Sequence, residues 1–257
     1  MKITFLGTGT SHGVPMIGCE CEVCSSTDSA NQRLRSSILV ESGGFHLVVD
    51  TTPDLRAQCL RAKIRDLDAI LYTHEHSDHV LGLDELRRFC MLHDKRLPAY
   101  GSERVLHCIE RIFPYAVSAP PPYKGLPELN LHKIDGPFSL GPWRLYPFRM
   151  PHGKTESMGF RFDKDGTPRF AYLTDCKMVP AAVRKGIHKI PLLILGVLRE
   201  KPHPTHLSVS EALEVIGEIH PARTLFTHLC HEMDHHIMNA KLPPGVALAR
   251  DEQVVEA

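Results

Sequence analysis

The densest concentration of reactive side chains in this 257-residue sequence lies at residues 73–79, which read Thr-His-Glu-His-Ser-Asp-His. His74, His76, Asp78 and His79 form a His-x-His-x-Asp-His pattern. Imidazole and carboxylate together favour zinc, manganese or iron(II), and are too rich in nitrogen for a typical calcium or magnesium site. A solvated helix start would explain one His-x-His pair, but not the whole pattern directly after an apolar strand. We therefore predict a metal site here.

Three further ligand-type residues follow later apolar segments that are expected to be strands. They are His152, Asp175 and His228. Loops at the ends of strands are where α/β proteins place their chemistry. Taken alone, His152 could be an ordinary loop histidine and Asp175 a helix cap. Their shared position at strand ends favours one common pocket.

A second group of ligand-type side chains lies near the N-terminus, where Cys19, Cys21 and Cys24 form a Cys-x-Cys-x-x-Cys motif. Three thiolates need a fourth ligand to close a tetrahedral zinc site, and the alternative is three reduced surface thiols. Clustered cysteines in a chain that starts with a strand, not with an export signal, favour metal binding over disulfides. We expect a cytoplasmic protein.

The elements that must position these residues alternate between strand and helix, which predicts an α/β fold. Apolar runs predict strands at 3–6, 37–40, 45–49, 69–72, 143–148, 158–163, 169–173, 192–198 and 223–226, and helical spacing covers 83–93, 103–112 and 208–219. Residues 114–137 are rich in proline and glycine and are expected to form an irregular surface excursion. The length fits a single domain spanning residues 1–257.

The charge balance narrows the class of partner. Lys plus Arg and Asp plus Glu are equal at 30 each, so nothing favours non-specific binding to nucleic acid or to a membrane surface. No apolar run of about 18 residues exists, which excludes a membrane-spanning helix. We expect a small-molecule substrate, no membrane partner and no nucleic-acid partner, and the sequence is compatible with a homodimer.

The His-x-His-x-Asp-His pattern and the three later ligands resemble the signature of the metallo-β-lactamase-fold hydrolases. The resemblance implies a four-layered αββα sandwich that holds two catalytic divalent cations, Mn²⁺ or Zn²⁺, with a bridging hydroxide as nucleophile. It implies one cation on His74, His76 and His152, a second on Asp78, His79 and His228, and Asp175 between them. Asp78 also counts among the catalytic residues.

The cysteine loop at 18–24 narrows the resemblance to the phosphoribosyl 1,2-cyclic phosphate phosphodiesterase (PhnP) subfamily. Members pair such a loop with a histidine three residues after the last catalytic histidine. The resemblance therefore implies that His231 completes a structural Zn²⁺ site with Cys19, Cys21 and Cys24, and Cys230 is a rival fourth ligand. The implied activity is hydrolysis of a small cyclic phosphodiester such as phosphoribosyl 1,2-cyclic phosphate.

The same resemblance assigns an acid for the leaving oxygen to His206, in the loop after strand 192–198. His203 competes for this role, and His206 would be a bystander if Thr205 or Ser208 only caps the next helix. Asp50 either orients a ligand histidine or caps a turn. Three other functions stay open: a tRNA-processing-type endonuclease, which would need a basic arm, a thioester or lactam hydrolase, and a non-catalytic metal-dependent binding protein.

Overall fold

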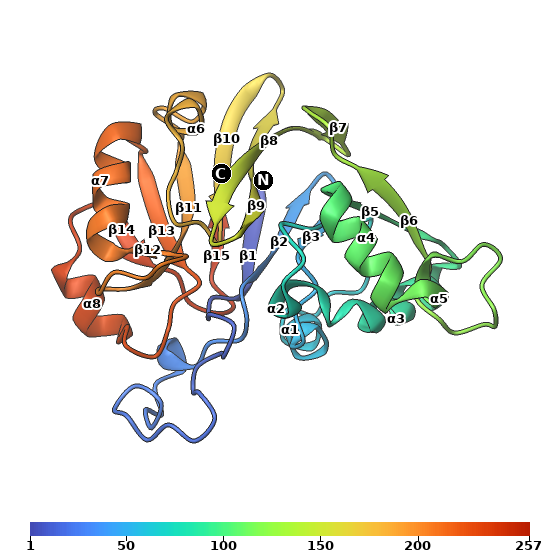
Figure 1. Cartoon of the computed structure of the whole chain (residues 1–257), viewed down its shortest axis with the longest axis horizontal. Helices are drawn as coiled ribbons and strands as arrows, with labels where there is room; N and C mark the ends of the chain where they lie inside the picture. Colours follow the sequence, from blue (N-terminus) through green and yellow to red (C-terminus); the bar gives the residue numbers. More distant parts are fainter.

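Two β-sheets packed face to face form the centre of the computed structural model, which describes residues 1–257 (Figure 1). Helices cover the outer face of each sheet, so the layers run helix, sheet, sheet, helix. This is the αββα sandwich that the resemblance to the metallo-β-lactamase-fold hydrolases implies. No helix is long and apolar enough to cross a membrane.

The first sheet has seven strands in the order β15-β1-β2-β3-β4-β5-β6. Strands β15 to β3 pair antiparallel, and β3 to β6 pair parallel. Their bounds are β1 (Lys2–Gly7), β2 (Ser37–Ser42), β3 (Phe45–Val49), β4 (Ala69–Leu71), β5 (Leu97–Gly101), β6 (Leu129–Lys133) and β15 (Val254–Glu256). Outside it lie α1 (Leu55–Arg61), α2 (Ser77–Val80), the 3-10 helix η2 (Leu83–Leu86), α3 (Arg87–His93), α4 (Glu103–Ile112) and α5 (Pro114–Val117).

The second sheet runs in the order β14-β13-β11-β10-β9-β8-β7, with β12 paired to β11. Its bounds are β7 (Phe138–Leu140), β8 (Trp143–His152), β9 (Thr155–Lys164), β10 (Thr167–Leu173), β11 (Leu192–Arg199), β12 (Leu207–Ser208), β13 (Arg223–Thr227) and β14 (Val246–Leu248). It is covered by α6 (Ala181–Gly186), α7 (Val209–Ile219) and α8 (His235–Lys241). Strands β10, β11, β13 and β14 pair parallel, so their carboxyl ends share one edge of the sheet.

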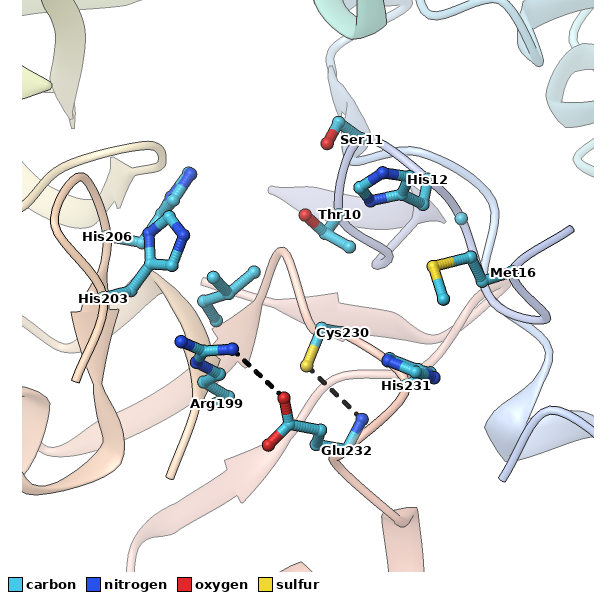
Figure 2. Close-up of a pocket in the computed structure, with 12 residues that line it drawn as sticks. Thr10, Ser11, His12, Met16, Arg199, His203, His206, Cys230, His231 and Glu232 are labelled. Carbon is cyan, nitrogen blue, oxygen red and sulfur yellow. Dashed lines mark hydrogen bonds and ion pairs between the residues drawn. The ribbon is translucent and has the colours of Figure 1, made fainter. Parts of the chain in front are cut away.

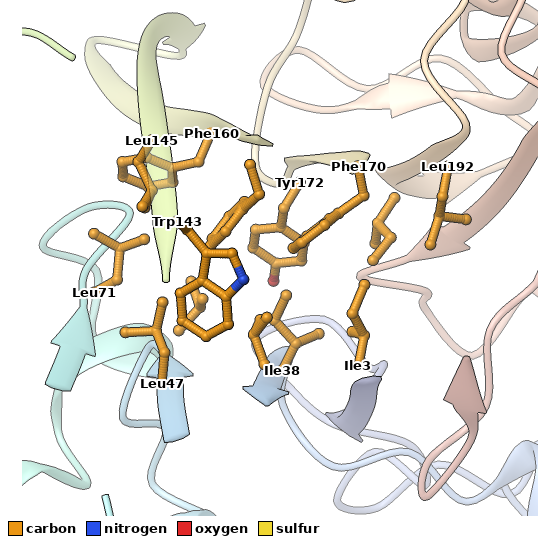
Figure 3. Close-up of a cluster of buried hydrophobic side chains, with 14 of the residues drawn as sticks. Ile3, Ile38, Leu47, Leu71, Trp143, Leu145, Phe160, Phe170, Tyr172 and Leu192 are labelled. Atoms are coloured by element: carbon orange, nitrogen blue, oxygen red, sulfur yellow. The ribbon is translucent and has the colours of Figure 1, made fainter. Parts of the chain in front are cut away.

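The core follows from the two-residue period of the strands, because successive side chains point to opposite faces. In β2, Ile38 and Val40 join the cluster of 22 buried residues between the sheets, while Leu39 faces the helices. Figure 3 shows this inter-sheet cluster, in which Trp143, Phe160 and Tyr172 of one sheet meet aliphatic side chains of the other. The packing fixes both sheets, and so it fixes where their strands end.

One expectation about the elements is wrong in part. Residues 114–137 are not wholly irregular, because they contain α5 and the edge strand β6. Leu129 is buried and β6 pairs with β5, so strand pairing there outweighs the proline-rich composition of the preceding loop. Asp165 and Gly166 both have positive φ in the tight β9–β10 hairpin. Residues 8–36, in blue beneath the sheets in Figure 1, contain the 3-10 helix η1 (Ser29–Asn31) and the cysteine loop.

Candidate metal centre

The ends of strands from both sheets meet at one edge of the sandwich. Strands β3 and β4 of the first sheet lead into Asp50 and into the segment 74–79. In the second sheet, β8 ends at His152, β13 ends directly before His228, and β10 ends two residues before Asp175. The seven residues predicted as ligands of two catalytic cations therefore lie together, although up to 154 positions separate them in the sequence (228 − 74).

Three imidazole nitrogens converge in the first half of this centre. His76 Nδ1 lies 3.0 Å from His74 Nε2 and 3.2 Å from His152 Nε2. Ligand nitrogens about 2.0–2.1 Å from a shared tetrahedral zinc ion would be about 3.3–3.4 Å apart. The spacing of the three nitrogens is therefore close to that of ligands around one cation.

The second half consists of Asp78, His79, Asp175 and His228, all buried. His79 Nε2 lies 3.3 Å from Asp78 Oδ2, and His228 Nε2 lies 3.2 Å from Asp175 Oδ2. Both imidazole nitrogens are buried and lack a hydrogen-bond partner. Because a buried polar atom without a partner is costly, these nitrogens suit a metal ion.

Asp175 occupies the position between the two halves. Its Oδ2 lies 3.8 Å from His74 Nε2 and 3.7 Å from His152 Nε2, while its Oδ1 lies 3.6 Å from His79 Nε2. One carboxylate thus faces imidazoles of both groups. This is the geometry expected of a ligand shared by two cations.

The electrostatics of the centre also favour cations. The carboxylates of Asp78 and Asp175 have histidines as their only basic neighbours within ion-pair distance. Burial raises the pKa of Asp175, but His228 and His79 outweigh it and hold this pKa well below its usual range. Burial lowers the pKa of His74 well below its ordinary value, so this ring is neutral and free to coordinate. Burial alone would lower the pKa of His79, but Asp175, Asp78 and Asp50 outweigh it and hold this pKa well above its ordinary value, and a cation would take the place of that proton. Carboxylates and imidazoles together form a donor set that fits divalent zinc or manganese.

Residues behind the ligands hold their rings in place. Asp50 Oδ2 accepts a hydrogen bond from His79 Nδ1 at 2.7 Å, and Asp50 also accepts from the backbone N–H and hydroxyl of Thr73. The backbone carbonyl of Thr205 accepts from His152 Nδ1 at 3.0 Å. These contacts leave each Nε2 directed at the centre. Of the two roles predicted for Asp50, the structure shows it orienting a histidine.

Backbone strain is concentrated at the same site. Asp50, Asp175 and His228 all have positive φ, at 66°, 49° and 60°. Side chains other than glycine rarely adopt this conformation, and it persists where the surroundings enforce it. This backbone conformation turns the side chains of Asp175 and His228 from the ends of their strands into the centre, and that of Asp50 toward His79.

His206 lies beside the ligands. Its ring centroid is 4.8 Å from those of both His152 and His228, and the His203 ring centroid lies 5.3 Å from that of His206. His206 lines the cavity over the ligands, and His203 does not. Burial, followed by the neighbouring His228, lowers the pKa of His206 to about 3. Ser208 does cap α7, through a capping box with Glu211, but His206 still faces the centre. The acid role of His206 stays a prediction.

The cysteine loop lies beside His231, as the resemblance to the PhnP subfamily implies. His231 Nδ1 lies 3.2, 3.5 and 3.7 Å from the sulfur atoms of Cys19, Cys21 and Cys24. The backbone N–H of Cys24 lowers the pKa of Cys21 to about 7, which favours the thiolate. Cys230 is not part of this group, because its sulfur accepts from the backbone N–H of Glu232 on the other side of the segment (Figure 2).

Two cavities open beside the centre. One of about 220 Å³ lies between His206 and the loop containing His12, and Figure 2 shows these side chains on its opposite sides. Another of about 490 Å³ lies over the ligands themselves and is also lined by Arg104 and Lys154. The sequence analysis did not single out these two basic residues. The only signal for Lys154 was its place two residues after His152, and Arg104 had none.

The sequence of this chain is similar to those of known proteins. The Beta-lactamase superfamily domain matches residues 46–229. The chain is 37% identical over 251 residues to an octanoyltransferase of Porphyromonas gingivalis, a match that covers 96% of this chain and 49% of that protein. The chain therefore spans about half the length of this relative, whose name describes the whole protein.

Two solved structures have a fold similar to that of this chain. The crystal structure of a diphosphatase from the PhnP family has a TM-score of 0.91 and 36% identity, with 100% of this chain and 96% of that chain covered. Zn²⁺-bound PqqB from Methylobacterium extorquens has a TM-score of 0.83 with 18% identity, and each chain is fully covered. The second likeness shows the fold alone.

Proposed function

The chain belongs to the β-lactamase superfamily and, within it, to the PhnP family, and from that premise we propose that it hydrolyses a small phosphodiester. It is a metal-dependent hydrolase of the metallo-β-lactamase fold. The substrate that we propose is a small cyclic phosphodiester such as phosphoribosyl 1,2-cyclic phosphate. The related diphosphatase makes a diphosphate linkage the alternative within the same chemistry.

The observation that carries this proposal is the position of Asp175 between two groups of ligands. One carboxylate within 4 Å of imidazoles from both groups suits a pair of cations that share it. Two cations at such a spacing can hold the oxygens of an in-line displacement at phosphorus and supply a water of near-neutral pKa. An anionic phosphodiester suits this centre better than an uncharged acyl group does.

Residues of this centre would hold the cations, fix the ligand rings and supply the acid. We propose His74, His76 and His152 as ligands of one cation, Asp78, His79 and His228 as ligands of the other, and Asp175 as the shared ligand. Asp50 and the carbonyl of Thr205 hold the rings of His79 and His152. His206, which lines both cavities, would act as the acid for the leaving oxygen if the anionic substrate beside it raises its pKa from the value of about 3 that burial and His228 impose.

For the cofactors we propose Mn²⁺ or Zn²⁺ at the catalytic centre and Zn²⁺ between the three thiols and His231. Soft thiolates in closed tetrahedral geometry select zinc. Such thiolates also suit a reducing, cytoplasmic setting. We propose a single domain over residues 1–257, with a small molecule as its partner.

A substrate panel tests this function. Protein loaded with Mn²⁺ or Zn²⁺ is assayed on a ribose 1,2-cyclic phosphate, a diphosphate diester, an octanoyl thioester and a precursor tRNA, with Asp175→Asn as the inactive control. We expect kcat/KM for the cyclic phosphodiester to exceed that for the thioester at least about a hundredfold. If the diphosphate diester is cleaved faster than the ribose 1,2-cyclic phosphate, a diphosphate becomes the proposed substrate in place of the cyclic phosphodiester.

The octanoyl thioester is in the panel because the octanoyltransferase relative makes acyl chemistry the second candidate function. Preferential cleavage of the thioester would overturn the phosphodiesterase proposal. The tRNA arm tests the endonuclease. An endonuclease would need cationic groups for phosphates, yet in the segment 114–137 Lys133 is already paired with Glu103 and Asp135.

A further inference from the structure

The two oxygens of the Asp175 carboxylate have different surroundings. Oδ2 lies 3.7 Å from His152 Nε2 and 3.2 Å from His228 Nε2, so it faces imidazoles of both halves of the centre. Oδ1 lies 3.6 Å from His79 Nε2 and accepts a hydrogen bond from the Thr174 hydroxyl at 2.6 Å. Each carboxylate oxygen offers about two acceptor sites, so the Thr174 hydroxyl takes up one of the two on Oδ1.

The Thr174 side chain is buried at the end of β10, directly before the shared ligand. A hydroxyl that donates to a carboxylate forms a short, strong hydrogen bond of about 2.5–2.7 Å, and the observed bond falls in that range. The last torsion of an aspartate side chain is otherwise broad and nearly two-fold, so its two oxygens can exchange places. The bond from Thr174 therefore decides which oxygen of Asp175 faces the imidazoles of both halves.

The strands on either side of β10 fix the backbone from which this hydroxyl extends. The Ser157 hydroxyl of β9 donates to the backbone carbonyl of Asp175 at 2.8 Å and lies 3.2 Å from that of Thr174. On β11, a Cβ at Gly196 would lie 3.0 Å from the Asp175 nitrogen and 3.1 Å from the Thr174 Cα, so any larger residue would crowd this approach. The Thr174 hydroxyl is thus placed by the sheet, before any cation binds.

The other carboxylate among the ligands gives a comparison within the same centre. Asp78 Oδ2 lies 3.3 Å from His79 Nε2 and 3.7 Å from His228 Nε2, which both belong to the second half. Of the two carboxylates, Asp175 is the one that faces both halves and the one that has a hydroxyl donor. The donor is therefore found where the orientation of a carboxylate affects two cations at once.

We propose that Thr174 is a positioning residue that assigns the shared ligand position to Oδ2 of Asp175. By holding Oδ1, its hydroxyl keeps Oδ2 directed at both groups of imidazoles. Since this role presupposes the metal centre of the proposed function, it adds to that centre a residue that is not itself a ligand. Without the hydroxyl the carboxylate can turn, and two cations would no longer share one fixed oxygen.

Metal binding tests this role without any substrate. The affinity for Mn²⁺ is measured by chelator competition, and the magnetic coupling of paired Mn²⁺ ions by electron paramagnetic resonance, in the wild type, Thr174→Val and Thr174→Ser. Valine has nearly the shape of threonine but lacks the hydroxyl, whereas serine retains it. Thr224→Val is the matched control, because Thr224 is buried in the same sheet but its hydroxyl has no hydrogen-bond partner in the chain.

In Thr174→Val we expect the affinity for at least one Mn²⁺ to fall about tenfold, with the signal of coupled ions replaced by that of isolated ions at the same loading. Thr174→Ser should recover most of the affinity, and Thr224→Val should bind as the wild type does. An affinity within about twofold of the wild type in Thr174→Val overturns the role. Equal losses in Thr174→Val and Thr174→Ser also overturn it, because the methyl group and not the hydroxyl would then matter.

The same measurements separate this role from the proposed function. If the wild type pairs two Mn²⁺ ions but cleaves no phosphodiester, the proposed function fails, and the metal affinities of the variants still decide the role of Thr174. If the wild type cleaves a phosphodiester but shows no coupled pair of ions, the proposed substrate stands and the positioning role is overturned.

Discussion

At the scale of single residues, the metal centre depends on side chains that are not themselves ligands. Each ligand imidazole needs its second nitrogen engaged, because otherwise the ring can rotate or take the wrong tautomer. For His79 that partner is the buried Asp50, which also accepts two hydrogen bonds from Thr73. Asp50 therefore couples the end of β3 to the ligand segment.

Replacing Asp50 by asparagine tests this coupling. The amide is a weaker acceptor than the carboxylate and can present an N–H to His79 Nδ1, so we expect metal affinity or kcat/KM to fall about 10- to 100-fold. Chelator competition measures the affinity. Asp251→Asn is the control, because the Asp251 side chain is also only 5% exposed but bonds Thr8 and Leu34. Equal metal affinity in Asp50→Asn and the wild type would refute the orienting role.

His206 allows a second residue-scale prediction. In His206→Ala we expect turnover to fall about 10²- to 10⁴-fold on a substrate with a poor leaving group, with metal content unchanged. The loss should shrink as the leaving group improves, because a good leaving group needs less help from a donor. His203→Ala serves as the matched control, because its ring centroid lies 5.3 Å from that of His206 and it does not line the cavity over the ligands. A larger effect in His203→Ala would move the role to that residue.

The residues that sequence reasoning found and missed differ in one physical respect. His74, His76, Asp78 and His79 stand out because four ligands share one short segment, and no other common use explains them. Arg104 and Lys154 are single basic residues on a helix and a hairpin, and thirty residues of the chain are Lys or Arg. Only the fold, which brings α4 beside the β8–β9 loop, distinguishes these two from the rest.

At the scale of elements, the segment 228–233 joins the two predicted metal sites. His228 faces the catalytic ligands and His231 faces the three thiols. The buried Arg33 donates to the backbone carbonyls of Cys230 and Met233 and so fixes the segment from behind. An ion held at one end of this segment would restrain the other end.

Removing one ligand of the thiol site should therefore act at both ends. In Cys19→Ser and in His231→Ala we expect the loss of one zinc per chain, a lower melting temperature and a weaker catalytic metal site. Elemental analysis and thermal unfolding measure these effects, with Cys59→Ser as a control thiol outside the cluster. Unchanged zinc content in both variants would refute the site.

The sequence predicts some strands and misses others, again because some depend on tertiary contacts. Strands buried between layers, such as β11, read as continuous apolar runs, and the sequence predicts them directly. Strand β6 is an edge strand with alternating exposure after a proline-rich loop, and its pairing with β5 depends on tertiary contact. Composition therefore suggested an irregular segment where the sheet continues.

At the scale of the whole molecule, the metal centre joins the two sheets. The segment 74–79 follows a strand of the first sheet, whereas His152, Asp175 and His228 follow strands of the second. The inter-sheet core holds the sandwich along its length, and the ligands close it at one edge. Bound cations would thus add a link across the interface that the core alone does not supply.

Metal removal should consequently destabilise the entire chain and not only a loop. Each cation present at about 100 times its Kd stabilises the folded state by about 2.7 kcal/mol, which corresponds to about 5–10 °C in melting temperature for a chain of this size. We expect the metal-loaded protein to unfold in one cooperative transition, and the chelated protein to unfold at a temperature lower by at least that amount, reversibly on adding metal back. Calorimetry measures both. Two separate transitions in the loaded protein would contradict a single domain over 1–257, and a melting temperature insensitive to chelation would contradict cations that tie the sheets together.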